Sequence, residues 1–441
     1  MSRYSSYRYS GIEWLGEIPA HWEISKLKWV ASVVLGKMLE EKMPPNVESA
    51  GYTLECYLKS KNVGWLELFV NENDVEQMWF SQREKDMYLL RAGDIVMNEG
   101  GDIGKVALWV DTGFNCYIQN SVHKISVIDS LVIPEYLLYL IYAASKSGYY
   151  WSMVNQISIA HLTKEKLENT SVLLPPLDEQ RTIAEYLSEK VADIDAIIKG
   201  KEDELSFLVT YRQAIILEAI TKGIRPDCEL HETGVEWIGQ IPEEWNVAKV
   251  GWLFDMIGSG TTPNTDNCDY YTDDSGIPWL QTGDLNDSSV VSTSKFVTPK
   301  AVKECHLTLY PRGSVVVAMY GATIGKIGLL NIDCCTNQAC CVLGKSQLLT
   351  NRYTYYAFLA SKQSLINKSV GGGQPNISQS IVREHMLPVP PLTYQNEITA
   401  YLDEKCVVTD TAINAIDKQI NDLSDYKKAL IYEVVTGKMN V

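Results

Sequence analysis

The chain has 441 residues, of which 46% are hydrophobic and 21% are charged, so it has room for about three soluble domains with sizeable cores. Its net charge is −16, from 39 basic and 55 acidic side chains. This excess of acid argues against nucleic acid as a partner, because contacts with phosphate need Lys and Arg, unless a partner subunit supplies part of the cationic surface.

Neither a membrane nor a metal is expected. The first residues lack the apolar run of a signal peptide, and the most apolar stretches contain Glu135 or Lys326 and are too short for a span. We therefore expect a cytoplasmic protein whose ten cysteines are reduced thiols. The pairs Cys334-Cys335 and Cys340-Cys341 lack the C-x-x-C spacing of a zinc ribbon, which favours buried strand thiols.

Two stretches in different halves of the chain share one motif. Gly11–Trp22 reads GIEWLGEIPAHW, and Gly234–Trp245 reads GVEWIGQIPEEW. Trp and Ile beside fixed Gly and Pro are typical of packing, so we predict an apolar clasp at the entrance of each of two domains. The motif is the first sign that the chain is an internal repeat.

The repeat continues through segments that resemble β-strands. Gly93–Met97 and Gly313–Val317 are each followed by a glycine-rich turn and the sequence Ile-Gly-Lys, which ends at Lys105 and at Lys326. Next come Gln119-Asn120 and Asn337-Gln338, and then helices that we predict to begin near Pro134 and Asn351. The copies diverge most over about residues 30–91 and 251–311, so similar frames carry different polar side chains. This difference is expected of two domains that recognise two different surfaces.

Each half ends in a long amphipathic segment, Leu177–Gly223 and Leu392–Gly437. Apolar residues recur at alternating steps of four and three, which predicts a narrow helical seam. We expect Asp178 and Thr393 to cap the starts of these helices, and Gly223 and Gly437 to cap their ends. A helix of this length would be about 65 Å long.

We predict that the two helices pair with each other as an antiparallel coiled coil; the alternative is that each is an ordinary helix buried in its own domain. The predicted fold is α+β, with two β-rich domains separated by this two-helix coil and related by an internal pseudo-two-fold repeat. The predicted divisions are 1–171, 172–225, 226–387 and 388–441. The seam residues chosen for the coil are Leu187, Ile194, Ile198, Leu205, Leu208, Ile215, Leu402, Ile413, Ile416, Ile420, Leu423 and Leu430.

Signatures of catalysis are missing from the sequence. The turns before Lys105 and Lys326 lack the glycine spacing and the Ser or Thr of a P-loop, and Gly371–Gly373 does not fit a dinucleotide fingerprint. The six histidines make no ligand-like spacing. We therefore predict no catalytic residues, although a carboxylate pair that only the fold brings together stays open.

The repeated motifs resemble those of a known family. GIEWLGEIPAHW, GDIVMNEGGDIGK and LLPPLDEQRTIAEYL, each echoed in the second half, are similar to the specificity subunit of type I restriction-modification enzymes. The resemblance covers nearly the whole chain. It implies two target-recognition domains that each read one half of a bipartite, asymmetric site in double-stranded DNA, with the coil setting the gap between the halves, in an enzyme of phage defence.

The resemblance also implies partners. Two modification subunits would dock on this chain, bind S-adenosylmethionine and methylate adenine at N6. Restriction subunits, an optional addition, would use ATP and Mg²⁺ to translocate and cleave unmodified DNA. This chain itself would bind no cofactor and would be non-catalytic.

Asn and Gln can form two hydrogen bonds with an adenine edge, and Lys or Arg can do so with guanine. Candidates for DNA contact in the first domain are Lys59, Lys61, Asn62, Lys105, Gln119 and Asn120. Candidates in the second are Gln281, Thr282, Lys326, Asn337, Gln338, Gln374, Asn376 and Ser378.

Each Asn or Gln could instead satisfy local backbone in a turn, and Lys105 and Lys326 could contact phosphate or only solvent. The rival function is a protein-binding scaffold with two β-rich modules on a coiled-coil rod, which the acidic charge favours.

Overall fold

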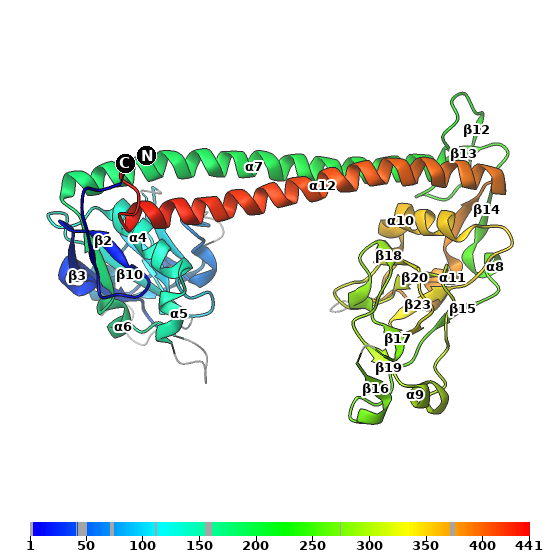
Figure 1. The fold of residues 1–441 in the computed structure, drawn as a ribbon, viewed down its shortest axis with the longest axis horizontal. Coiled ribbons are helices and arrows are strands. Elements are labelled where there is room, and N and C mark those ends of the chain that lie inside the picture. The colour runs from blue at the N-terminus through cyan, green and yellow to red at the C-terminus, as the bar shows by residue number, and fades with distance from the viewer. Residues whose placement is uncertain are drawn as a thin grey trace. The chain divides into compact units, whose positions relative to one another are not determined.

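The computed structural model describes residues 3–40, 42, 51–70, 75–110, 113–154, 161–273, 275–370 and 375–441. The chain divides into two compact units, which are drawn in Figure 1. Unit 1 comprises Met1–Glu202 and Lys418–Val441, and unit 2 comprises Asp203–Asp417. Each unit thus holds one β-rich domain and a part of both long helices. No described helix is long and apolar enough to cross a membrane.

The first domain is built on a mixed arrangement of short sheets. Its main sheet has the strand order β4-β10-β7-β8, with β4 at Ala31–Leu35, β10 at Val122–Val127, β7 at Ile95–Asn98 and β8 at Val106–Leu108. A second sheet has the order β6-β5-β9, with β6 at Gln77–Phe80, β5 at Thr53–Leu58 and β9 at Tyr117–Ile118. Strand β11 (Ser171–Leu174) pairs with β3 (Glu23–Lys26), so the end of the domain returns to its beginning. Helix α4 (Pro134–Lys146) packs its apolar residues into the same core as β7 and β8.

The second domain repeats this plan. Its main sheet has the order β15-β23-β20-β21-β18, and its second sheet has the order β16-β19-β17-β22. The bounds are β15 Ile257–Ser259, β23 Cys340–Leu343, β20 Val315–Ala318, β21 Ile327–Leu330, β18 Ser288–Val290, β16 Tyr271–Thr272, β19 Phe296–Val297, β17 Ile277–Leu280 and β22 Cys335–Thr336. Strand β14 (Asn246–Lys249) pairs with β24 (Met386–Val389), and helix α10 (Asn351–Asn367) takes the place of α4. Both helices begin at the residues predicted for them.

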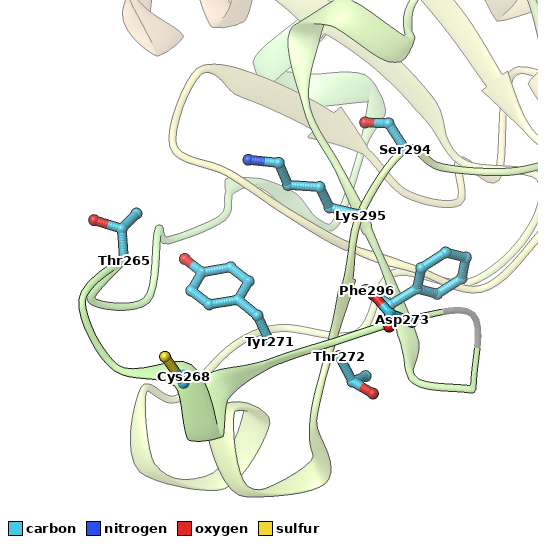
Figure 2. A pocket seen from close by; sticks show the side chains of 8 residues that line it. All are labelled: Thr265, Cys268, Tyr271, Thr272, Asp273, Ser294, Lys295 and Phe296. Carbon is cyan, nitrogen blue, oxygen red and sulfur yellow. The ribbon is translucent and has the colours of Figure 1, made fainter.

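A cleft of about 720 Å³ opens beside β16 and β19 in the second domain (Figure 2). In Figure 2 the side chains of Lys295 and Tyr271 both extend toward Thr265. The lining is completed by Cys268, Thr272, Asp273, Ser294 and Phe296.

The two long helices are α7 (Leu177–Thr221) and α12 (Leu392–Val435). In unit 1, Asp195 of α7 forms an ion pair with Lys427 of α12 at 2.5 Å. In unit 2, Arg212 of α7 binds Asp410 of α12 at 2.7 Å. Asp195 and Arg212 are separated by the same number of residues as Asp410 and Lys427. The later residue of α7 pairs with the earlier residue of α12, so the helices are antiparallel and both ion pairs fit one register. The predicted α+β fold, with two β-rich domains and paired long helices, is confirmed.

The ion pairs explain the polar residues that interrupt the seam, since Arg212 and Lys427 occupy equivalent positions in the two copies. Apolar seam residues near the domains are fully buried, as at Leu187 and Leu402. Those nearer the middle, such as Leu205, are only partly buried. Two helices that pair without a third element leave the sides of their seam open to solvent, and this explains why burial of the seam decreases away from the domains.

A buried glutamine fixes each long helix to its domain. The Gln180 amide oxygen accepts from the Ile133 N–H at 3.0 Å, and its nitrogen donates to two backbone carbonyls. Gln395 repeats these bonds, accepting from the Thr350 N–H at 2.7 Å. Both side chains are fully buried. Because three hydrogen bonds satisfy each amide, its burial costs little while it fixes the helix start against the loop before α4 or α10.

The predicted helix caps are confirmed at one end and wrong at the other. Gly223 and Gly437 have φ of +77° and +72°, the left-handed conformation expected of a C-terminal cap. The helices begin at Leu177 and Leu392, two residues earlier than caps at Asp178 and Thr393 would require, so Asp178 and Thr393 lie inside the first turn. The Asp178 carboxylate therefore interacts favourably with the positive end of the helix dipole but does not cap the helix.

The repeated Trp-Gly-Ile-Pro motif forms the predicted clasp in each unit. Trp22 is buried against Gly437 at the end of α12, where an added Cβ would lie 3.1 Å from the Trp ring and 2.3 Å from Pro19. Trp245 lies in the same way against Gly223 at the end of α7. Each domain entrance therefore closes on the last turn of a long helix, and only glycine fits there.

The four clustered cysteines lie in the second domain and are fully buried. Burial raises the pKa of Cys335 to about 11 and that of Cys341 to about 12, so they remain thiols at neutral pH. This fits the prediction of buried strand thiols.

Candidate nucleic-acid interface

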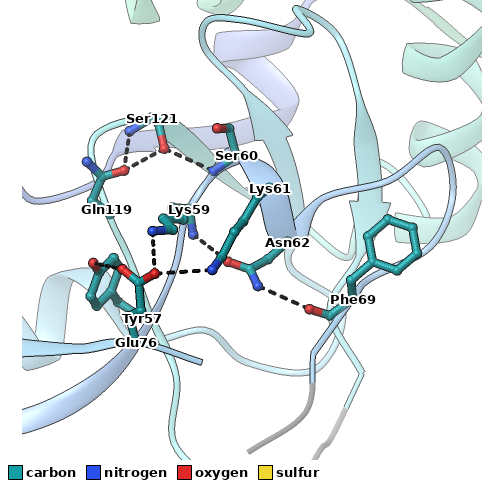
Figure 3. Close-up of polar contacts among 9 residues, drawn as sticks. All are labelled: Tyr57, Lys59, Ser60, Lys61, Asn62, Phe69, Glu76, Gln119 and Ser121. Carbon is teal, nitrogen blue, oxygen red and sulfur yellow. Dashed lines mark hydrogen bonds and ion pairs between the residues drawn. The ribbon is translucent and has the colours of Figure 1, made fainter. Parts of the chain in front are cut away.

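In the first domain the candidate residues gather around η1 (Ser60–Asn62), a single turn of 3-10 helix that follows β5 (Figure 3). The Asn62 side chain accepts from the Lys59 N–H at 3.1 Å and donates to the Phe69 carbonyl at 3.1 Å. Asn62 is also buried. Its amide thus binds the local backbone at both ends, which is the alternative role considered for it from the sequence.

The lysines on either side of Asn62 share one carboxylate. Lys59 and Lys61 both contact Glu76, the latter at 3.1 Å, and the Tyr57 hydroxyl donates to the same carboxylate at 2.8 Å (Figure 3). Hydrogen bonds from Lys59, Tyr57 and Lys61 lower the pKa of the Glu76 carboxyl to about 2. Glu76, whose side chain is 45% exposed, therefore keeps its charge and holds both ammonium groups on one side of the turn.

Gln119 and Asn120 lie beside this turn because β5 and β9 form a parallel ladder, with Tyr57 opposite Tyr117. The Ser121 hydroxyl accepts from the Ser60 N–H at 3.0 Å and donates to the Gln119 side-chain oxygen at 2.5 Å. The Gln119 nitrogen in turn donates to the Asn120 side chain at 2.6 Å. A parallel ladder and one serine thus bring together two segments that are far apart in the sequence.

The second domain builds the same frame with different chemistry. Its turn is η3 (Thr282–Asp284), and Asp284 replaces Asn62, accepting from the Gln281 N–H at 2.9 Å. The parallel ladder of β17 and β22 places Asn337 beside the turn, where its N–H donates to the Leu280 carbonyl at 3.0 Å. Gln281 and Thr282 are partly exposed.

The remaining candidates near this turn bind their neighbours. The Asn337 side chain accepts from the Ala339 N–H at 3.1 Å. The exposed Gln338 accepts from the Thr262 hydroxyl. The cleft of Figure 2 joins the same site, because the Ser294 N–H donates to Asp284 at 3.1 Å.

Three candidates belong to a different segment. Asn376 exchanges backbone hydrogen bonds with Val370, and Ser378 caps α11 (Gln379–Glu384) by accepting from the Ile381 N–H at 3.3 Å. Gln374 and the glycines before it lie outside the described residues.

The two lysines of the Ile-Gly-Lys turns have polar partners. Lys105 binds Asp102, three residues earlier, at 2.6 Å, and Lys326 donates to the Asn286 side chain at 3.0 Å. Neither partner would prevent contact with a phosphate, since exposed ion pairs and single hydrogen bonds at a surface are weak.

Sequence reasoning did not identify Glu76, Ser121 or Thr262, which position the candidate side chains. A signal was available for Ser121, because it directly follows the candidate pair Gln119-Asn120. No comparable signal exists for Glu76, which lies in the stretch where the two copies diverge.

Known proteins are similar to this chain along most of its length. The family model described as "Type I restriction modification DNA specificity domain" matches residues 19–206 and 242–422. The MjaVIII specificity subunit of a type I restriction enzyme from Methanocaldococcus jannaschii is 23% identical over 96% of this chain and 94% of its own length. The putative MjaX specificity subunit from the same organism is 24% identical over 97% and 96%.

A solved structure has the same fold. It is described as "Structural basis underlying complex assembly and conformational transition of the type I R-M system", and it matches 96% of this chain and 99% of its own with a TM-score of 0.69. The sequence identity is 16%, so this likeness concerns the fold alone.

Proposed function

Because the chain belongs to the family of type I restriction modification DNA specificity proteins, its function is DNA recognition, and we propose that each of its two domains reads one half of a bipartite, asymmetric site. One observation carries this proposal. The same turn beside the same parallel ladder presents Lys59 and Lys61 in one domain and Gln281 and Thr282 in the other. One frame with unlike side chains is what recognition of two different half-sites requires.

The side chains at each turn suit different bases. Lys59 and Lys61 favour guanine, whose major-groove edge offers two acceptors, and Gln281 suits the paired donor and acceptor of adenine. Each good pair discriminates against the wrong base by about 1–3 kcal/mol. Asn62 is left out of the proposed contacts because its amide is bound to the backbone.

Gln119 and Asn120 complete the proposed base contacts of the first domain, and Asn337 and Gln338 complete those of the second. The side chains of Gln119, Asn120 and Gln338 bond exposed or partly exposed neighbours, which a base edge can replace. The Asn337 oxygen accepts from the N–H of the buried Ala339, so only its amide nitrogen is offered to a base. Lys105 and Lys326 are assigned to phosphate contacts that position the duplex without reading it.

The chemistry is assigned to partner chains on the strength of family membership. Modification subunits that bind S-adenosylmethionine would methylate adenine at N6, and restriction subunits would use ATP and Mg²⁺ for cleavage. This chain would then be the non-catalytic part of the assembly. Partner subunits would also offset its charge of −16, which is unfavourable for DNA binding alone.

The test is binding of a duplex library by the chain with and without its modification subunits. The proposal expects retention of particular bipartite sequences once those subunits are present. Retention without sequence preference under those conditions would leave the protein-binding scaffold, which the acidic charge favours, as the better account. Methyl transfer by this chain alone would contradict the assignment of catalysis to partners.

A further inference from the structure

A lysine without a carboxylate partner lies on an aromatic surface in unit 1. The Lys146 ammonium, at the end of α4, is 3.2 Å from the centre of the Trp65 ring and 5.6 Å from that of Tyr142. The two rings meet edge to face, with centres 5.7 Å apart. Among the described residues no Asp or Glu pairs with Lys146. A cation over Trp is attracted by the ring and is held in one place, but its charge is not neutralised.

Other lysines surround this ammonium group. Burial lowers the pKa of Lys146 to about 8, and repulsion from Lys428, Lys427 and Lys105 adds to the shift. Lys427 and Lys428 come from α12, whose C-terminal part packs into the same core as α4 (Figure 1). Three elements therefore bring four lysines together in a chain that is acidic overall.

Two of the neighbouring lysines, Lys105 and Lys428, each have an aspartate partner that is well exposed, whereas Lys427 is 17% exposed and pairs with Asp195 of α7. Lys105 binds Asp102 at 2.6 Å, and Lys428 binds Asp425 at 2.8 Å; both pairs join residues three apart. The carboxylates are 69% and 76% exposed. Such pairs contribute little free energy, so a phosphate could replace the aspartates.

The equivalent place in unit 2 is neutralised. Lys362, the counterpart of Lys146, binds Asp287 at 2.5 Å. Asp287 lies five residues after Thr282 with φ of +53°, and Leu66, six residues after Ser60 in the first domain, has φ of +67°. At this point of the repeat one domain thus carries Asn286 and Asp287, and the other carries Trp65 and Leu66. Leu66 thus stands where unit 2 has the carboxylate of Asp287, and the neighbouring Trp65 ring lies under the Lys146 ammonium, which leaves Lys146 without a carboxylate partner.

We propose that Lys146, together with Lys105 and Lys428, forms a binding site for a backbone phosphate of DNA that unit 1 has and unit 2 lacks, with the charge of Lys427 close by. The proposal rests on the proposed function and adds a site to it. Hydrogen bonds link this lysine cluster to η1, the turn proposed to contact bases, and this proximity favours DNA over another acidic ligand. The Asn98 N–H donates to the Lys105 carbonyl at 2.9 Å, and the Asn98 side chain donates to the Ser60 carbonyl at 3.1 Å.

The consequence is an anchor that adds affinity without reading sequence. A phosphate among these lysines would remove the repulsion that lowers the pKa of Lys146, so binding favours its protonated form. The ring of Trp65 holds the ammonium in place before DNA arrives, which reduces the ordering required on binding.

The test compares Lys146→Gln with the matched change Lys362→Gln, each in the complex with the modification subunits. DNA affinity is measured by fluorescence anisotropy from 50 to 300 mM salt, on a target duplex and on an unrelated one. Loss of one phosphate contact lowers the slope of log affinity against log salt by about 0.9 and weakens binding about eightfold at 0.1 M salt. We expect this for Lys146→Gln on both duplexes, with the methylated sequence unchanged, and no change of slope for Lys362→Gln.

Lys146→Arg is the control for folding and charge, and it should keep the slope. Between pH 7 and 9 the wild-type complex should lose affinity, whereas Lys146→Arg should lose less, because Arg stays charged. An unchanged slope for Lys146→Gln would overturn the proposal. So would weaker assembly with the modification subunits at an unchanged slope, since the site would then face an acidic protein surface. Absence of sequence preference in the wild-type complex would instead contradict the proposed function.

Discussion

Glu76 controls how many positive charges the first recognition turn offers to DNA. Its carboxylate holds both Lys59 and Lys61, and Glu76→Gln removes that negative charge while keeping the size of the side chain. If both lysines then reach phosphates, the slope of log affinity against log salt becomes steeper by about 1.8. Over a fourfold rise in salt, from 50 to 200 mM, the variant should lose about 12-fold more affinity than the wild type.

The assay is fluorescence anisotropy with an unrelated duplex, in the complex with the modification subunits. Discrimination between target and unrelated DNA should fall, because lysines that Glu76 no longer positions bind any phosphate. The matched control is Glu384→Gln, which frees Lys249 from an ion pair of 2.5 Å outside both recognition turns. An unchanged slope for Glu76→Gln, or an equal increase for Glu384→Gln, would refute the placement of this turn on DNA.

Three further predictions concern the stability of the fold. Gln180→Ala and Gln395→Ala each leave buried backbone groups without partners. Each unpaired group costs about 1–3 kcal/mol, so each variant should lower the free energy of unfolding by at least this amount, measured by denaturant titration. Leu187→Ala and Leu402→Ala empty equivalent, fully buried seam positions and should each cost about 2–5 kcal/mol, seen as faster hydrogen exchange in both long helices. Because the pKa of Glu76 is lowered to about 2 from 4.5, its contribution to stability is complete above about pH 4.5 and is lost as pH falls toward 2, and Glu76→Gln should remove that part of the acid dependence.

Local sequence patterns were sufficient to predict the architecture. The seam period predicted the long helices, and the glycine after each of them placed its C-terminal end within two residues. The repeated motifs predicted two related domains, each with a clasp at Trp22 or Trp245. These features depend on residues that are close together in the sequence, or on repetition, which a single sequence displays directly.

The details of the site depended on contacts between distant segments. The parallel ladders that bring Gln119 to Ser60 and Asn337 to Leu280 leave no trace in local periodicity. Whether Asn62 faces a base or the backbone is decided by Phe69 and Lys59, not by residue type. Nothing in the local sequence marks Lys146, which is distinguished only by its position over the Trp65 ring.

The central claim is that two domains on one chain read two halves of a DNA site independently. The most direct measurement is sequencing of methylated adenines after about residues 30–160 are replaced by those of another family member. The account predicts that one half of the methylated sequence changes while the other half and the gap between them stay the same. A change in both halves, or in neither, would contradict it.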